Sequence, residues 1–215
     1  MSLTHIIVIL DRSGSMGGCR YETVTGFDEF VTTQKLEEGE AKLTLTQFDH
    51  EYEVVYLEKD LKEVQSIKDT YYPRGSTALL DAIGRTIATT NESLVMKSKS
   101  QLPDRVLCLI ITDGYENSSK EYNRDQIKKM IAEQEKGNWE FVFLGAGIDA
   151  VEQATSMGIK GSSAASYNTS NMDGVFTKLA DKASMYRGAS DVDLRNIKEC
   201  TSAIFDDQDR EDLSQ

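Results

Sequence analysis

The sequence predicts an α/β fold: a doubly wound, mostly parallel sheet with helices on both faces. Three apolar runs, at 6–10, 105–111 and 139–144, show no alternation with polar residues, which indicates strands that are covered on both faces. Amphipathic segments with apolar residues at helical spacing lie between these runs. The runs end in short polar or glycine-containing loops, so strands and helices alternate as they do around a parallel sheet.

The other elements follow from the same patterns. Phe27 and Phe30 lie on the buried face of a helix expected over 20–36. Segments 42–48 and 52–57 are rich in Thr, Val and Tyr and lie close together, which predicts an antiparallel hairpin at one edge of the sheet. The remaining elements expected are helices over 76–90, 123–136, 150–157 and 174–186, and a last edge strand that begins near Ile159.

The chain of 215 residues fits one domain with an appended segment, because single domains typically have about 100–200 residues. We expect the domain to cover residues 1–187. Residues 188–215 are polar and acidic, and we expect them to form a tail that is partly disordered.

The formal net charge of −12 argues against two classes of partner. Nucleic acids and anionic membranes both attract basic surfaces, so we expect neither. Cys19, Cys108 and Cys200 form no CxxC pair, which is typical of a reducing compartment. No run approaches the roughly 20 apolar residues that span a bilayer. The expected location is the cytoplasm.

Hard oxygen donors are concentrated in three loops. Asp11, Ser13 and Ser15 follow the first strand, Thr77 precedes a helix, and Asp113 follows the strand at 105–111. Ligands of open α/β sheets bind beyond the carboxyl ends of the strands, where the strand order reverses. If the first strand and the strand at 105–111 are neighbours there, Asp11 and Asp113 face each other. Hydroxyl and carboxylate oxygens are the ligands of Mg²⁺, so these five residues are the candidate site for Mg²⁺ or Mn²⁺.

The small number of carboxylates leaves such an ion incompletely neutralised. It would then take an outside anion as its last ligand, and the natural candidate is an Asp or Glu side chain of a protein partner. Arg74, Tyr115 and Glu116 lie beside the loops and are the expected rim for that partner. The competing interpretation is ordinary loop chemistry, because Ser and Thr often cap helices and Asp-Gly often forms turns.

Three stretches resemble one known family. Ile-Val-Ile-Leu-Asp-Arg-Ser-Gly-Ser-Met at 7–16, Arg-Gly-Ser-Thr-Ala-Leu-Leu-Asp-Ala-Ile at 74–83 and Ile-Ile-Thr-Asp-Gly at 110–114 are similar to the metal-site loops of von Willebrand factor type A domains. That family's metal-ion-dependent adhesion site is a DxSxS motif followed by a Thr and an Asp. All of these positions are present, as Asp11, Ser13, Ser15, Thr77 and Asp113, and the resemblance covers about residues 4–187.

The resemblance implies a six-stranded Rossmann-like sheet of order 3-2-1-4-5-6 with one antiparallel edge strand. It also implies metal-dependent protein binding, and the motifs look most like those of stand-alone intracellular bacterial or phage members. Alternatives that share the site are an accessory subunit of an AAA+ ATPase or chelatase-type complex, and a structural phage or virion-associated protein.

A metal-dependent hydrolase is the remaining alternative, although we expect the protein not to be an enzyme. The sequence has no Walker A loop and no GxSxG elbow. Its two histidines, His5 and His50, are both expected at the surface. No general base is therefore expected beside the ion other than its own ligands.

Overall fold

The structure is a computed structural model, and it describes residues 2–198 and 203–215. Six strands form one sheet of order β3-β2-β1-β4-β5-β6, which confirms the predicted order. All neighbouring strands are parallel except β2 and β3, the predicted hairpin at the edge. The strands are β1 Leu3–Asp11, β2 Glu40–Phe48, β3 Tyr52–Asp60, β4 Arg105–Thr112, β5 Trp139–Ala146 and β6 Ala164–Tyr167.

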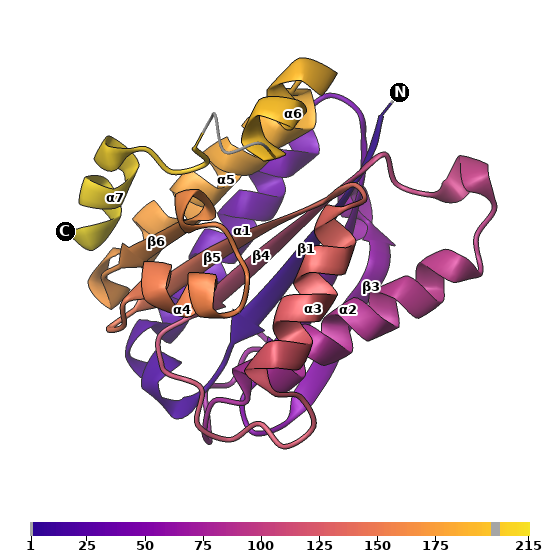
Figure 1. Cartoon of the computed structure of the whole chain (residues 1–215). Helices are drawn as coiled ribbons and strands as arrows, with labels where there is room; N and C mark the ends of the chain where they lie inside the picture. The colour runs from indigo at the N-terminus through magenta and orange to yellow at the C-terminus, as the bar shows by residue number, and fades with distance from the viewer. Residues whose placement is uncertain (1, 199–202) are drawn as a thin grey trace.

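Helices cover both faces of this sheet (Figure 1). The α-helices are α1 Arg20–Leu36, α2 Leu79–Val95, α3 Arg124–Glu135, α4 Ala150–Ser156, α5 Met172–Gly188, α6 Asp191–Lys198 and α7 Asp207–Ser214. The short 3₁₀ helices are η1 Gly14–Cys19, η2 Leu61–Glu63, η3 Lys99–Gln101, η4 Gly161–Ser163 and η5 Thr169–Asn171. None of the described helices combines the length and the apolar character needed to cross a membrane.

The central strand β1 shows why the sheet is covered twice. Ile6, Val8 and Leu10 belong to the hydrophobic cluster that includes α1 and α5. Ile7 and Ile9 belong to the second cluster, under α2, α3 and α4. Because successive side chains of a strand point to opposite faces, a strand buried on both faces is apolar at every position. This accounts for the continuous apolar run seen in the sequence.

His5 is buried in β1, so the expectation that both histidines lie at the surface was wrong for this residue. The cause is the place of β1, which has β2 on one side and β4 on the other. The His5 Nε2 atom lies 2.8 Å from the Thr44 hydroxyl, and burial is the main reason that its pKa falls to about 3. The ring is therefore neutral at ordinary pH.

The bounds of helix α2 and of the last strand differ from the prediction. Helix α2 spans Leu79–Val95, so it begins and ends later than the predicted range 76–90; it begins at Leu79 because the backbone of Ala78, its N-cap, is not helical (φ −97°, ψ 62°). The last strand is Ala164–Tyr167 and does not start near Ile159. Its short sequence, Ala-Ala-Ser-Tyr, lacks the β-branched run that marks the other strands, which is why the pattern did not indicate it.

Residues after 188, expected to form a partly disordered tail, contain helices α6 and α7. Phe205 and Leu213 are buried in the cluster that includes α1 and α5. The N–H of Asn168 donates to the Leu213 carbonyl at 2.9 Å, and this bond joins α7 to the end of β6. Asp209 also pairs with Lys178 of α5 at 3.0 Å. Helix α7 therefore lies against the edge strand β6 and against α5 (Figure 1).

The contact between α1 and α5 yields a stability prediction. A Cβ added at Gly26 of α1 would lie 2.5 Å from the ring of Phe176 on α5, a distance that forces one helix or the ring to move. We expect Gly26→Ala to lower the free energy of unfolding by about 1–3 kcal/mol, measured by urea denaturation. Gly188→Ala is the matched control, because a Cβ there meets no atom within 4 Å. Equal stability of the two variants would contradict this tight packing.

Candidate metal site

Three loops meet at the carboxyl ends of two central strands. β1 ends at Asp11, β4 ends at Thr112, and the two strands are parallel neighbours. β2 lies on one side of β1 and β4 on the other, so the strand order reverses at this point. The predicted reversal of strand order is therefore present, and such a point is where open α/β sheets bind their ligands.

Three of the predicted ligands contact one another directly. The Ser15 hydroxyl donates to Asp113 Oδ1 at 2.6 Å, and the Ser13 hydroxyl lies 3.4 Å from the same oxygen. The two serine hydroxyls are 3.1 Å apart. Residues 13 and 15 of the first loop and residue 113 of the third loop thus place three oxygens in one small cluster.

The Asp11 carboxylate is fully buried behind this cluster. Its Oδ1 accepts the Ser13 N–H at 2.6 Å, and its Oδ2 accepts the Thr112 hydroxyl at 2.5 Å. The Tyr71 hydroxyl donates to the backbone carbonyl of Asp11 at 2.7 Å, which fixes the end of the strand. Burial raises the Asp11 pKa to about 6, with a further contribution from the negative charge of Asp113, although the hydrogen bonds oppose the shift.

Thr77 is in the second loop and contacts the third. Its N–H donates to Asn117 Oδ1 at 2.9 Å, and its carbonyl accepts the Asn117 N–H at 3.0 Å. A Cβ added at Gly114 would lie 3.5 Å from the Thr77 hydroxyl, so this hydroxyl is beside the third loop. Among the described residues, it makes no hydrogen bond to the other four predicted ligands.

These donors suit a hard divalent cation. Mg²⁺ binds six oxygens at about 2.1 Å in octahedral geometry, so adjacent ligands are about 3 Å apart. The three oxygen–oxygen distances in the cluster, from 2.6 to 3.4 Å, bracket that separation. Within residues 2–198 and 203–215, no group of three or more His, Cys, Asp or Glu side chains could hold a metal ion. A cation at this site would depend on hydroxyl oxygens as well as carboxylates.

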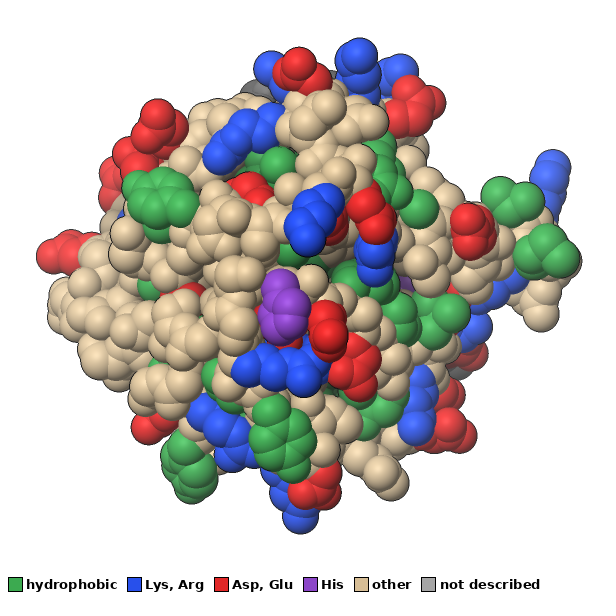
Figure 2. Space-filling view, turned by 90° about the horizontal axis from the view of Figure 1, so that it is seen from below, with side chains coloured by type: hydrophobic (Ala, Val, Ile, Leu, Met, Phe, Trp, Pro, Cys, Tyr) green, Lys and Arg blue, Asp and Glu red, His purple; other side chains and the backbone are tan. Residues whose placement is uncertain are grey.

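Two of the three rim residues are accessible. The Tyr115 side chain, two residues after Asp113, is about half exposed. Arg74 is also about half exposed, but its guanidinium forms ion pairs with Asp49 and Glu51. Figure 2 looks onto this end of the molecule and shows acidic and basic side chains gathered beside a histidine. Tyr115 is therefore the freer of the two to contact a partner.

The third rim residue, Glu116, has its carboxylate occupied within the protein. Its Oε2 accepts the N–H of Leu80, in the first turn of α2, at 2.9 Å. Its Oε1 accepts the N–H groups of Ser118 and Ser119 at 2.8 and 2.7 Å. The structure thus gives Glu116 contacts that join the third loop to the start of α2.

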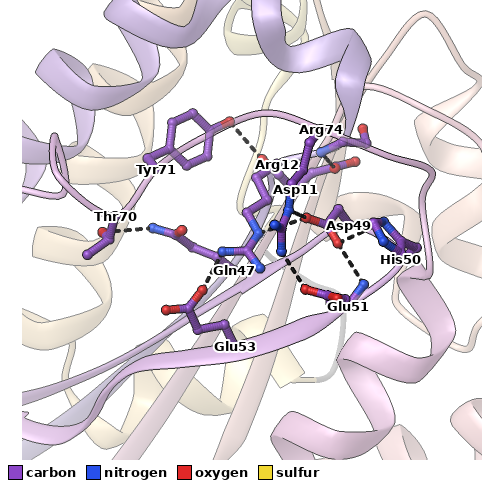
Figure 3. Close-up of polar contacts among 11 residues, drawn as sticks. Asp11, Arg12, Gln47, Asp49, His50, Glu51, Glu53, Thr70, Tyr71 and Arg74 are labelled. Carbon is purple, nitrogen blue, oxygen red and sulfur yellow. Dashed lines mark hydrogen bonds and ion pairs between the residues drawn. The ribbon is translucent and has the colours of Figure 1, made fainter.

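Sequence reasoning did not identify an ion-pair network beside the site, in which Asp49 and Arg12 are buried (Figure 3). The Asp49 carboxylate accepts hydrogen bonds from Arg12 at 3.0 Å and from Arg74 at 2.9 Å. The outer ends of the two guanidinium groups pair with Glu53 and Glu51. The available signal was the position of Asp49, directly after a buried strand, as Asp11 lies at the end of β1 and Asp113 follows β4.

The protonation of Asp49 contrasts with that of Asp11. Burial alone would raise the Asp49 pKa, but the Glu51 N–H and the guanidinium groups of Arg74 and Arg12 lower it below its usual range. Asp49 is thus a fully compensated carboxylate, whereas Asp11 has hydrogen-bond donors and no basic side chain bonded to it.

Comparison with known proteins places this geometry in context. The family model of the von Willebrand factor type A domain matches residues 5–182. No curated protein matches the sequence. Proximal thread matrix protein 1 from the mussel byssus, in a structure with a zinc-occupied MIDAS motif, shares 14% identity at a TM-score of 0.60 and is matched over 85% of this chain and 48% of its own.

Two microbial structures have the same fold. A von Willebrand factor type A protein from Catenulispora acidiphila shares 16% identity at a TM-score of 0.55, over 85% of this chain and 43% of its own. The ArnB paralog VWA2 from Sulfolobus acidocaldarius shares 19% identity at a TM-score of 0.55, over 85% of this chain and 45% of its own. This chain thus spans about half the length of the structures that it matches.

The buried Asp11 carboxylate yields a prediction for the metal-free protein. Its folded pKa of about 6 lies above the unfolded value near 3.9, so the free energy of unfolding should fall as pH rises through about 6. In EDTA at pH 7.5, we expect Asp11→Asn to be more stable than wild type by about 2 kcal/mol in urea denaturation, because the variant carries no buried charge. The difference in free energy of unfolding between this variant and wild type should be smaller at pH 5, where part of the Asp11 population is protonated in wild type. A variant that is less stable at both pH values would refute this account.

Proposed function

We propose that this chain, which belongs to the von Willebrand factor type A family, binds one divalent cation, Mg²⁺ or Mn²⁺. The bound cation would coordinate an acidic residue of a protein partner. The close approach of the Ser13, Ser15 and Asp113 oxygens carries the proposal. With Asp11 and Thr77 they form the complete metal-ion-dependent adhesion site.

Each ligand has a role that follows from its chemistry. The hydroxyls of Ser13, Ser15 and Thr77 would supply neutral oxygens. Asp11 and Asp113 would hold the ion directly or through its water molecules, as carboxylates commonly hold Mg²⁺. The bound cation would supply positive charge and a coordination position that a carboxylate from outside can fill. The Ser13 N–H and the Thr112 hydroxyl keep the Asp11 oxygens in place for this task.

A protein that presents Asp or Glu fits the surface around the site. The chain's net charge of −12 would repel an acidic group in the absence of a cation. Tyr115 and Arg74 are half exposed beside the loops, and Tyr and Arg are enriched in the residues that dominate protein interfaces. The same charge disfavours nucleic acids and anionic membranes as partners.

We further propose that the protein has no catalysis of its own and works in the cytoplasm. His5 is buried and neutral, and His50 lies beside Asp49. We therefore expect neither histidine to act as a general base at the proposed metal site. Cys19 and Cys108 are free and buried, which is in keeping with a reducing compartment. Screening of phosphoesters with Mg²⁺ or Mn²⁺ tests the first statement: turnover that Asp113→Ala abolishes would overturn it.

Metal binding is tested by calorimetry. We expect wild type to bind one Mg²⁺ or Mn²⁺ at or below millimolar concentration and Asp113→Ala to lose detectable binding, because the variant lacks the carboxylate that joins Ser13 and Ser15. Asp181→Ala, which removes an exposed carboxylate on α5, is the matched control and should bind as wild type does. No heat of binding from wild type with either metal at millimolar concentration would reject the proposed function.

We expect binding of the partner to be lost completely when the metal ion is removed. In a pull-down from the native cell, we expect wild type to retain a protein in Mg²⁺ and to lose it in EDTA, because the acidic ligand and the acidic surface repel each other once the cation is removed. Asp113→Ala should fail to retain that protein even in Mg²⁺. Capture that persists unchanged in EDTA would contradict recognition through the metal.

A further inference from the structure

Asp49 lies at the junction of two of the three metal-site loops. It follows β2, whose partner strand β1 ends in the first loop. The N–H of Arg12 donates to the carbonyl of Phe48 at 2.7 Å, and the N–H of Ala78 donates to the carbonyl of Asp49 at 2.8 Å. The backbone around residue 49 is therefore bonded to the first loop on one side and to the second loop on the other.

The side chain of Asp49 bridges the same two loops. It is fully buried, and its Oδ2 accepts hydrogen bonds from Arg12 of the first loop and Arg74 of the second (Figure 3). Both donors are guanidinium groups, which are planar and lose little freedom for each bond that they form. The remaining oxygen, Oδ1, accepts the N–H of Glu51 at 2.6 Å and lies 3.2 Å from His50 Nδ1. These four partners together restrict the position and orientation of the Asp49 carboxylate.

The two loops also contact each other directly. The N–H of Arg74 donates to the carbonyl of Arg12 at 2.8 Å, and the N–H of Gly14 donates to the carbonyl of Gly75 at 3.1 Å. Gly75 has a φ of +69°, and a Cβ there would fall 2.1 Å from His50 Nδ1. Glycine is thus required where the second loop passes the hairpin turn. Ser13 and Ser15 flank Gly14, and Thr77 comes two residues after Gly75, so these contacts lie next to the predicted ligands of both loops.

We propose that Asp49 is a positioning residue of the metal site: by holding Arg12 and Arg74 together, it sets the distance between the Ser13–Ser15 loop and the Thr77 loop. The inference rests on the proposed metal site and concerns a residue that would not touch the ion. Mg²⁺ demands near-ideal geometry, so a small displacement of one loop weakens its binding. Groups that orient metal ligands from outside the coordination shell typically change affinity by about 10–100-fold when they are mutated.

The decisive variant is Asp49→Asn, which keeps the shape of the side chain and removes its charge. We expect calorimetry to show Mg²⁺ binding weakened by about 10–100-fold. Glu53→Gln is the charge-matched control, because Glu53 pairs with the same Arg12 guanidinium, is half exposed, and has no bond to Arg74. It loses one negative charge as Asp49→Asn does, and we expect its affinity for Mg²⁺ to stay within about threefold of wild type.

Two further readouts separate positioning from general stability. Ile131→Ala truncates a buried residue of α3 and should lower the unfolding midpoint while leaving Mg²⁺ affinity unchanged. Ca²⁺ tolerates flexible coordination, whereas Mg²⁺ does not. Asp49→Asn should therefore weaken Mg²⁺ binding more than Ca²⁺ binding, which neither a loss of stability nor a loss of one charge would do.

The outcomes distinguish this inference from the proposed function. If wild type binds neither Mg²⁺ nor Mn²⁺, the metal site itself is refuted. If wild type binds but Asp49→Asn matches Glu53→Gln in Mg²⁺ affinity, the metal site stands and the positioning role of Asp49 is rejected. An equal loss of Mg²⁺ and Ca²⁺ affinity in Asp49→Asn would assign its effect to charge and would also reject the positioning role.

Discussion

The parallel pairing of β1 with β4 is the constraint on which the candidate site depends. It brings the ends of two buried strands together, with Leu10 in register with Ile111, and so places Asp11 and Asp113 in one crevice. Burial disfavours the charged form of both carboxylates and raises both pKa values, and the negative charge of Asp113 adds to this effect at Asp11. The apolar packing on both faces holds this arrangement in place, because a shift of either strand would expose or misplace buried side chains.

Three carboxylates follow or end neighbouring strands at this edge, and their surroundings separate their roles. Asp49 beside β2 is balanced by Arg12 and Arg74, and its pKa falls. Asp11 and Asp113 have hydroxyl and N–H donors instead, and their pKa values rise. Hydrogen-bond donors orient a carboxylate but do not cancel its charge. The protein thus supplies guanidinium groups to Asp49, whereas the described partners of Asp11 and Asp113 are N–H and hydroxyl donors.

The fold could be predicted from the sequence because its signals are local, and the five proposed metal ligands, which stay a prediction, were chosen on local signals too. Each buried strand is a continuous apolar run, and each loop places its donors within a few residues of a strand end or helix start. The position of Asp49 after a buried strand is a local signal, but its partner Arg12 is 37 positions away, so the local sequence does not indicate their pairing. His5 and the C-terminal helices were missed for a related reason: His5 is polar in a strand that is buried on both sides, and Phe205 and Leu213 are isolated apolar residues in an acidic segment.

Charge at the site explains why recognition of an acidic partner would require the ion. Without a cation, Asp11 and Asp113 present up to two negative charges to the incoming carboxylate, on a chain whose net charge is already −12. A divalent ion would remove this repulsion, and the hydroxyl ligands add no charge. Where a carboxylate holds the ion only through a water molecule, the ion stays incompletely neutralised and can take a further anionic ligand. A third carboxylate in the ligand set would neutralise the ion within the protein, so the hydroxyl-rich composition of the cluster would leave the proposed site open to a partner.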